Sequence, residues 1–273
     1  MSNNEQPTAV PLLAPLLGRI HEQRPLVHHI TNMVVMNDTA NITLAIGASP
    51  VMAHALEEVE EMVKLAQALV LNIGTLTPEQ IEAMVRAGKR ANELGIPIVL
   101  DPVGAGATSL RTHSALRLLR ELRISALRGN ASEVGTLVGA AAETRGVDSI
   151  SLAEDREAVA NRAARAFGCT VAITGARDVV TDGQRLARIE NGHPLLAAIT
   201  GSGCMATTLV AAFLAIESDT WLATTAGLVA MGLAGEIAAP KAGGPGTFRS
   251  HLLDAVAGLN EETFAHGQKV SIA

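Results

Sequence analysis

The sequence has no tyrosine and few aromatic residues of any kind, with four phenylalanines and one tryptophan among 273 residues. It also has no basic excess, because 21 lysines and arginines stand against 27 acidic residues and give a net charge of −6. Proteins that bind nucleic acid usually present basic patches and aromatic side chains on which bases stack. The composition therefore argues against a nucleic-acid partner.

Cysteine is equally scarce. Cys169 and Cys204 are the only two, and their separation fits neither a zinc-ligand spacing nor a disulfide framework. Free thiols are typical of a reducing cytoplasm. Residues 1–8 lack the charged-then-apolar pattern of a secretion signal, and the apolar run 220–235 is shorter than the ~20 residues that cross a bilayer. We therefore expect a cytoplasmic protein without a membrane partner.

Apolar residues make up 48% of the chain and charged residues only 18%, which is ample for a packed core and argues against disorder. The length allows one large domain or two small ones. Because we find no linker, repeat or low-complexity stretch, we expect a single domain over residues 1–273, with residues 1–10 as a loose tail.

Short apolar runs alternate with amphipathic segments along most of the chain. This rhythm predicts an α/β fold with a mostly parallel central sheet and helices on both faces. We expect strands over residues 26–30, 49–52, 69–73, 96–100, 124–127 and 170–173, and an edge hairpin over 179–181 and 185–189. We expect helices over residues 11–23, 57–66, 78–94, 110–122, 131–138, 152–167, 204–216, 220–239 and 247–265, and one capped by Asn37 or Asp38 that runs to 45.

The stretch Thr200-Gly201-Ser202-Gly203-Cys204 precedes an apolar helix. A glycine turn at a helix start presents unpaired N–H groups and the positive end of the helix dipole, so it can hold a phosphate or an oxyanion. The same dipole is expected to lower the pKa of the Cys204 thiol. The alternative is a glycine-rich loop before a core helix that contains a small buried cysteine.

Six positions that we assign to strand ends carry polar or glycine-rich residues, and ligands bind at such ends in parallel α/β sheets. Asp101 directly follows a buried strand and could hold Mg²⁺ directly or through water; the alternative is an Asp-Pro turn. Glu133 could serve the same site or simply close a capping box with Asn130. The six strand ends lie at 31–32, 72–74, 101–102, 128–130, 174–175 and 200–201.

Three further groups carry two interpretations each. Arg128 could pair with phosphate oxygens or lie solvated at a strand end. Thr174 could donate to a phosphate or shape a turn. His28 and His29 are adjacent in a predicted strand and point to opposite faces, so they cannot form one metal site, and we assign them a structural or substrate-lining role.

Together these residues resemble hydroxyethylthiazole kinases, which have a ribokinase-like fold. The resemblance extends over nearly the whole chain, and its specificity comes from the order of its motifs. The matching stretches are 27–32 (VHHITN), 47–52 (GASPVM), 71–75 (LNIGT), 100–104 (LDPVG), 128–133 (RGNASE), 200–204 (TGSGC) and 244–248 (GPGTF).

The resemblance implies ATP-dependent phosphorylation of the hydroxyl of 4-methyl-5-(2-hydroxyethyl)thiazole, with Mg²⁺ as cofactor, in a homotrimer whose substrate pockets lie at subunit interfaces. By this resemblance Met52, Gly201 and Asn32 lie at the thiazole, Arg128 and Thr174 at the ATP phosphates, Asp101 and Glu133 at Mg²⁺, and the loop 243–247 beside the nucleotide. From the helix start itself we expect the N–H groups of Gly201, Ser202 and Gly203 to stabilise the transferring phosphoryl group, next to Cys204.

One residue departs from the broader superfamily, which usually carries an aspartate base where this chain has Cys204. Because phosphoryl transfer proceeds through a loose transition state, positioning and charge stabilisation supply most of the rate. We therefore expect Cys204 to orient the acceptor hydroxyl and, if it ionises, to accept its proton. The open alternatives are a pyridoxal or hydroxymethylpyrimidine kinase, a non-catalytic nucleotide-binding protein, and a cysteine hydrolase.

Overall fold

The apolar runs form one continuous sheet in the computed structural model, which describes residues 13–144 and 155–273. Within these residues the strand order is β2-β1-β3-β4-β5-β6-β7-β8-β9. The first six strands along the chain are parallel, and the last three pair antiparallel. The strands are β1 (Leu26–Ile30), β2 (Ser49–Val51), β3 (Ala68–Asn72), β4 (Ile98–Asp101), β5 (Ala126–Asn130), β6 (Thr170–Thr174), β7 (Asp178–Thr181), β8 (Leu186–Ile189) and β9 (Val270–Ile272).

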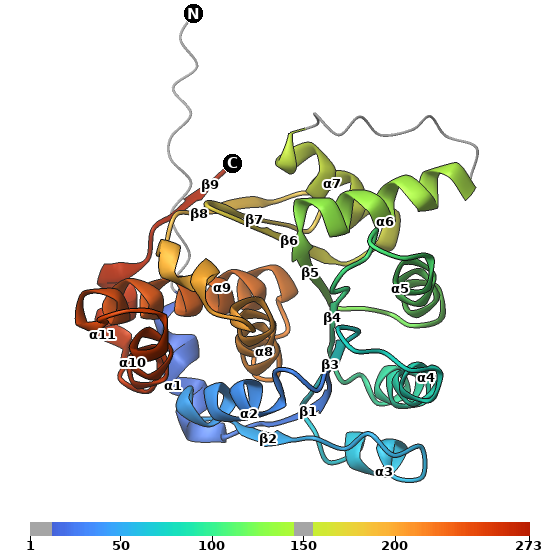
Figure 1. Ribbon diagram of the computed structural model, residues 1–273, viewed down its shortest axis with the longest axis horizontal. Helices are drawn as coiled ribbons and strands as arrows, with labels where there is room; N and C mark the ends of the chain where they lie inside the picture. The colour runs from blue at the N-terminus through green and yellow to red at the C-terminus, as the bar shows by residue number, and fades with distance from the viewer. Residues whose placement is uncertain (1–12, 145–154) are drawn as a thin grey trace, which may run out of the picture.

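Helices cover both faces of the sheet (Figure 1). On one face lie α3 to α7, and on the other lie α1, α2 and α8 to α11, each layer with its own apolar core. The helices are α1 (Ala14–Gln23), α2 (Met36–Ala45), α3 (Val59–Val63), α4 (Pro78–Leu94), α5 (Ser109–Glu121), α6 (Ala131–Thr144), α7 (Arg156–Phe167), α8 (Ser202–Leu214), α9 (Thr220–Ala238), α10 (Pro245–Ala257) and α11 (Glu261–Gly267), with short 3₁₀ turns η1 (Pro194–Ala198) and η2 (Ala239–Lys241).

The side chains of each strand point alternately to the two faces of the sheet and so belong to two separate apolar cores. Val70 of β3 belongs to the core beneath α8 and α9, whereas its neighbours Leu69 and Leu71 belong to the core beneath α4 and α5. Successive side chains of a strand point to opposite faces, so an apolar run of this kind is buried on both sides. The α/β fold with a mostly parallel sheet is confirmed.

Helices α8 and α9 form the centre of one layer. They approach closely at Gly227, where an added Cβ would lie 2.6 Å from the backbone of Val210. The apolar segment Thr220–Lys241 is long enough to cross a membrane by length and composition alone, but 78% of its most apolar window is buried inside the protein. Burial of this extent is typical of a core helix.

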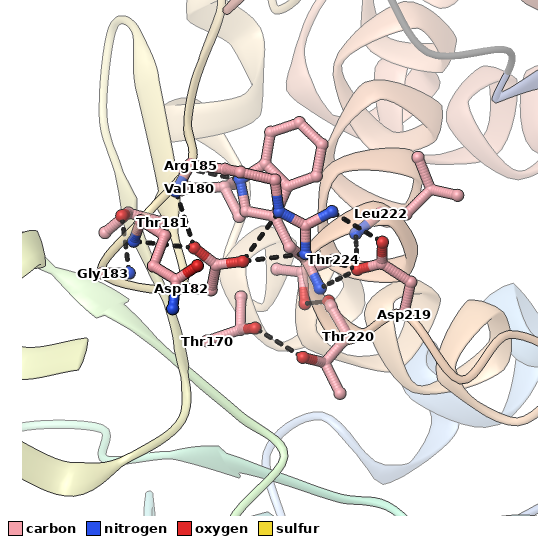
Figure 2. A network of polar contacts seen from close by, with 12 residues as sticks. Thr170, Val180, Thr181, Asp182, Gly183, Arg185, Asp219, Thr220, Leu222 and Thr224 are labelled. Carbon is pink, nitrogen blue, oxygen red and sulfur yellow. Dashed lines mark hydrogen bonds and ion pairs between the residues drawn. The ribbon is translucent and has the colours of Figure 1, made fainter. Parts of the chain in front are cut away.

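The turn between β7 and β8 is fixed to the start of α9 (Figure 2). The Arg185 guanidinium donates to both carboxylate oxygens of Asp219, at 2.7 and 2.9 Å, and to Asp182 at 2.8 Å. It also lies 4.6 Å from the centre of the Trp221 ring. Asp219 in turn accepts from the backbone N–H groups of Trp221 and Leu222 and caps α9. These contacts join the β7–β8 turn to helix α9.

Several predicted boundaries need correction. The segment 247–265 is two helices, because the chain leaves α10 at Gly258 and Asn260 begins α11 with a capping box. Neither Asn37 nor Asp38 caps α2, which begins after Val35 without a side-chain cap from the described residues. The predicted hairpin is present but is not the edge, since β9 pairs with β8 beyond it.

Other boundaries are shorter or shifted. Helix α3 covers only Val59–Val63 of the predicted 57–66. Strand β5 begins at Ala126 and includes Arg128, which was expected just beyond a strand. By contrast, Thr77 caps α4 as predicted, and Gly95 ends it in a left-handed conformation. The predictions for residues 1–10, and the parts of two predicted helices at 11–12 and 152–154, lie outside the described residues.

Candidate active site

Five of the six predicted polar strand ends lie at strand ends and meet in one row across the sheet, whereas residues 200–201 follow the 3₁₀ turn η1 instead of a strand. The Asn32 amide Nδ2 donates to Asn72 Oδ1 at 2.8 Å, and Asn72 Nδ2 donates to Asp101 Oδ2 at 3.0 Å. Arg128 continues the row, since its Nη1 lies 3.8 Å from Asp101 Oδ1 and its Nη2 donates to Thr174 Oγ1 at 2.6 Å. The parallel strands thus bring residues far apart in the sequence to one rim.

The glycine turn lies over this row. Gly201 precedes α8 in the left-handed region at φ 83°, a conformation that other residues rarely adopt, and Ser202 begins the helix. A Cβ on Gly203 would lie 2.7 Å from Arg128 Nη1. The glycine therefore lets the guanidinium approach the helix start. Because no described side chain caps α8, its first N–H groups can receive an anion.

The Cys204 thiol lies within the first turn of α8. Its sulfur accepts from Asn72 Nδ2 at 3.2 Å and from Asn32 Nδ2 at 3.5 Å. Burial, followed by the negative charge of Asp101, raises the pKa of Cys204 to about 11. The expectation of a lowered pKa was therefore wrong, because burial and the charge of Asp101 raise the pKa of Cys204 more than the amide donors and Arg128 lower it. At neutral pH the thiol is protonated.

Asp101 is completely buried, and burial raises the pKa of its carboxyl to about 6. One carboxylate oxygen, Oδ2, accepts from Thr207 Oγ1 at 2.8 Å as well as from Asn72. The other, Oδ1, has no hydrogen-bond partner among the described residues. A buried carboxylate with a spare oxygen is typical of a functional site.

Glu133 fulfils the capping interpretation. Its Oε2 accepts from Asn130 N at 2.8 Å, while Asn130 Oδ1 accepts from Glu133 N at 2.9 Å, which is a complete capping box. Its other oxygen, Oε1, accepts from Gly104 N at 2.8 Å, in the loop that follows Asp101. This hydrogen bond ties Glu133 to the loop that follows Asp101.

A magnesium ion suits this donor set. Among residues 13–144 and 155–273, no three His, Cys, Asp or Glu side chains gather as a metal cage. Mg²⁺ dehydrates reluctantly and is usually held by one or two carboxylates, its own waters and substrate phosphates. The spare oxygen of Asp101 and the adjacent Glu133 match that requirement.

A cavity of about 600 Å³ opens beside the row. Its polar end is formed by Arg128, Thr174, Ser202 and Gly203, so the structure brings these four predicted residues together. Apolar side chains from η1 and α9 also line it, and they include Leu196, Ala197, Leu228 and Met231. One cavity therefore offers both an anion-binding end and an apolar wall.

Two predicted segments lie at the margins. Met52 follows the edge strand β2 and is half-buried, on the same rim as Asn32, which follows β1. Residues 243–247 were predicted as a loop, but α10 begins at Pro245, so the last three of them are helical. The Phe248 ring of α10 lies 6.4 Å from the ring of His193, which lines the cavity, whereas residues 243–247 do not line it.

His28 and His29 are fully buried, as expected for structural residues. His28 Nε2 contacts the Ala53 carbonyl at 2.8 Å, whereas His29 Nε2 lies 3.4 Å from Thr43 Oγ1. Burial lowers the pKa of both imidazoles, that of His29 to about 3. They are neutral at physiological pH and hold the chain around the end of β1.

Sequence reasoning missed three residues. Asn72 was noted only as a strand end, and Thr207 was hidden in an apolar helix. Asp178, at the start of β7, lines the cavity and accepts from Gly175 N at 2.8 Å; burial raises its pKa to about 6. Only Asn72 gave a signal, because a polar side chain that ends a fully apolar strand needs a partner.

A Gly203→Ala variant tests the contact between the helix start and Arg128. We expect it to fold, since the obstructed atoms are at the end of a flexible side chain, but to raise the KM for ATP about 10-fold or more, because the guanidinium must move. Steady-state kinetics measures this. Gly135→Ala is the control, since its Cβ meets only Val159, at 4.0 Å; equal KM values for both variants would contradict the assignment.

The sheet, its helix layers and the glycine turn define a ribokinase-like fold. The structure is similar to a ribokinase-like superfamily protein from Enterococcus faecalis, with a TM-score of 0.62, 15% identity, and coverage of 85% of this chain and 86% of that one. The model of the hydroxyethylthiazole kinase family matches residues 17–262. The chain therefore belongs to the hydroxyethylthiazole kinase family.

Known hydroxyethylthiazole kinases are similar in sequence to this chain over almost its full length. A hydroxyethylthiazole kinase from Roseiflexus is 55% identical over 258 residues, which cover 94% of this chain and 96% of that protein. Another, from Desulforudis audaxviator, is 56% identical over 257 residues and covers 94% of each. The solved structure of a hydroxyethylthiazole kinase from Pyrococcus horikoshii is 46% identical, with a TM-score of 0.89, and covers 96% of this chain and 98% of that one.

Proposed function

We propose that this kinase transfers the terminal phosphoryl group of ATP to the hydroxyl of 4-methyl-5-(2-hydroxyethyl)thiazole, in thiamine salvage, and releases the thiazole phosphate and ADP. Membership of the family indicates the acceptor. The observation that carries the chemistry is the close approach of Arg128 to the open start of α8, beside the buried Asp101 and the half-buried Cys204. This arrangement gathers positive charge where a phosphoryl group would be transferred.

The nucleotide occupies the cavity in this proposal. Arg128 and Thr174 bind the phosphates, with the N–H groups of Ser202 and Gly203 at the helix start. The apolar wall, which includes Leu228, receives the adenine. The polar and apolar parts of one cavity thereby fix the direction in which ATP lies.

Asp101 and Glu133 would hold Mg²⁺, mostly through its waters. The ion, when bound, neutralises charge on the phosphate oxygens. Asp101 offers the spare Oδ1, and Thr207 and Asn72 prevent the carboxylate from rotating because they occupy Oδ2. Arg128 limits the electrostatic cost of keeping this charge buried, since it lowers the pKa of Asp101 against the effect of burial.

The acceptor hydroxyl lies at Cys204, with Asn32, Gly201 and Met52 around the thiazole ring. Because the thiol is protonated at neutral pH, it orients the hydroxyl and does not deprotonate it. The hydroxyl oxygen forms its bond to the γ-phosphorus as the bond to the ADP oxygen breaks, and the hydroxyl proton passes to a phosphoryl oxygen. A loose transition state needs little deprotonation of the acceptor before this exchange.

A homotrimer in the cytoplasm completes the proposal. Two large apolar side chains, Met33 (69%) and Val34 (62%), are exposed at the acceptor end of the sheet, directly after Asn32. Exposed apolar side chains gathered in one region are typical of an interface. A second copy seated there would cover them and enclose the thiazole between subunits.

The direct test is a coupled ADP-release assay with Mg-ATP and a panel of alcohols: hydroxyethylthiazole, pyridoxal and hydroxymethylpyrimidine. We expect turnover with the thiazole alone. Turnover only with one of the other alcohols would replace the proposed substrate, and ATP binding without turnover on any of them would favour a nucleotide-binding protein.

A further inference from the structure

Asn72 lies at the centre of the polar row and is 1% exposed. Its amide makes four hydrogen bonds. The oxygen accepts from Asn32 Nδ2 at 2.8 Å and from Gly74 N at 2.9 Å, and the nitrogen donates to Asp101 Oδ2 at 3.0 Å and to Cys204 Sγ at 3.2 Å. One side chain therefore joins the carboxylate assigned to Mg²⁺ and the thiol assigned to the acceptor.

The orientation of this amide is fixed by its partners. The backbone N–H of Gly74 can only donate, so the side-chain oxygen of Asn72 must face it. The NH₂ group must then face Asp101 and Cys204. Asn32 is fixed in the same way, because its oxygen accepts from the backbone N–H of Val34 at 3.1 Å. Both amides consequently direct N–H groups at the sulfur.

This geometry decides what Cys204 can offer a ligand. A thiol has two lone pairs on sulfur and one weak S–H donor. Two amide donors engage the sulfur, so the S–H remains to bind the acceptor hydroxyl oxygen. We infer that Asn72 is a positioning residue: it directs the Cys204 S–H toward the acceptor oxygen and holds Asp101 with Oδ1 free. This inference rests on the proposed function.

The kinetic test compares two variants that remove different contacts. Asn72→Ala removes the donors to both Cys204 and Asp101. Thr207→Val removes a donor to Asp101, together with its contact to the Gly203 carbonyl at 3.2 Å, and leaves both donors to Cys204 in place. We expect Asn72→Ala to lower kcat with the thiazole about 10- to 100-fold while the KM for ATP changes little, because the acceptor is misplaced and the nucleotide cavity is not. Thr207→Val should lose less activity.

A spectroscopic test reads the thiol directly. The S–H stretching band of Cys204 lies in a region of the infrared spectrum that is free of other protein bands, and buried Cys169 supplies a reference band. In the wild type, hydroxyethylthiazole should shift the Cys204 band to lower frequency as the S–H begins to donate. The shift should persist in Thr207→Val and disappear in Asn72→Ala.

Three outcomes separate the possibilities. If the wild type turns over the thiazole without any shift of the Cys204 band, or if Asn72→Ala retains full kcat, the inference is wrong and the proposed function stands. If the wild type neither binds nor phosphorylates the thiazole, the proposed function is wrong, and the inference about Asn72 falls with it. The wild-type spectrum needs no variant, so the inference remains testable even if Asn72→Ala does not fold.

Discussion

An Asp101→Asn variant is expected to lose about 10²–10³-fold in kcat/KM and yet to be more stable than the wild type at neutral pH. The loss follows because an amide cannot supply the negative charge with which Asp101 would hold Mg²⁺ in the proposed site. The gain follows because burial raises the pKa of Asp101 from 3.8 to about 6, so its ionisation opposes folding. A shift of this size corresponds to roughly 3 kcal/mol.

The direction in which stability changes with pH tests whether burial of the Asp101 charge causes the gain in stability. The folded-state pKa of Asp101 is raised, so its contribution to stability is fully present below about pH 3.8 and is lost as the pH rises through about 6. The stability advantage of Asp101→Asn should therefore grow between these values and stay constant above them. Denaturant unfolding of both proteins without nucleotide, across this range, measures it.

Either half of the result can contradict the account. An Asn variant with wild-type kcat/KM would show that the charge has no part in catalysis. A variant that is less stable than the wild type above pH 6 would show that hydrogen bonds from Thr207 and Asn72 outweigh the burial of the charge. Thr207→Val is a useful control, because it keeps the charge and removes one of those bonds.

Replacing Arg128 with glutamine is expected to raise the KM for ATP and lower kcat, together by about 10²–10³-fold in kcat/KM. The guanidinium contacts Thr174, abuts Gly203 and opposes the buried charge of Asp101. Its loss removes the positive charge at the polar end of the cavity.

Arg128→Lys separates charge from geometry. It keeps the charge but loses the planar fork that lets one side chain reach Thr174 and the helix start together, so an intermediate loss is expected. Steady-state kinetics and calorimetric titration with ADP measure both variants. Glutamine and lysine variants that bind ADP as tightly as the wild type would place the phosphates elsewhere.

The sequence predicted those features that depend on neighbouring residues. A fully apolar run marked β3, and Thr77, Pro78 and Gly95 fixed both ends of α4. The polar strand ends were also predictable, because the carboxyl ends of parallel strands share one edge. A glycine turn followed by an apolar run identified the start of α8.

Features that depend on distant residues escaped prediction. The raised pKa of Cys204 comes from burial and from Asp101, which is remote in the sequence. Strand β9 forms only because the C-terminal segment returns to β8, and Asp38 pairs with Arg249 of α10 instead of capping α2. Local sequence patterns carry no information about contacts between residues far apart in the chain, so these features could not be predicted.

The central claim is direct transfer of the ATP terminal phosphoryl group to the thiazole alcohol. The most direct measurement supplies ATP whose γ-phosphoryl oxygens are labelled with oxygen-18 and identifies the products by mass spectrometry. We predict hydroxyethylthiazole phosphate that carries the labelled phosphoryl oxygens, together with ADP. Labelled inorganic phosphate beside unmodified thiazole would show that water is the acceptor, and it would contradict the assignment of Cys204 and its neighbours to the acceptor alcohol.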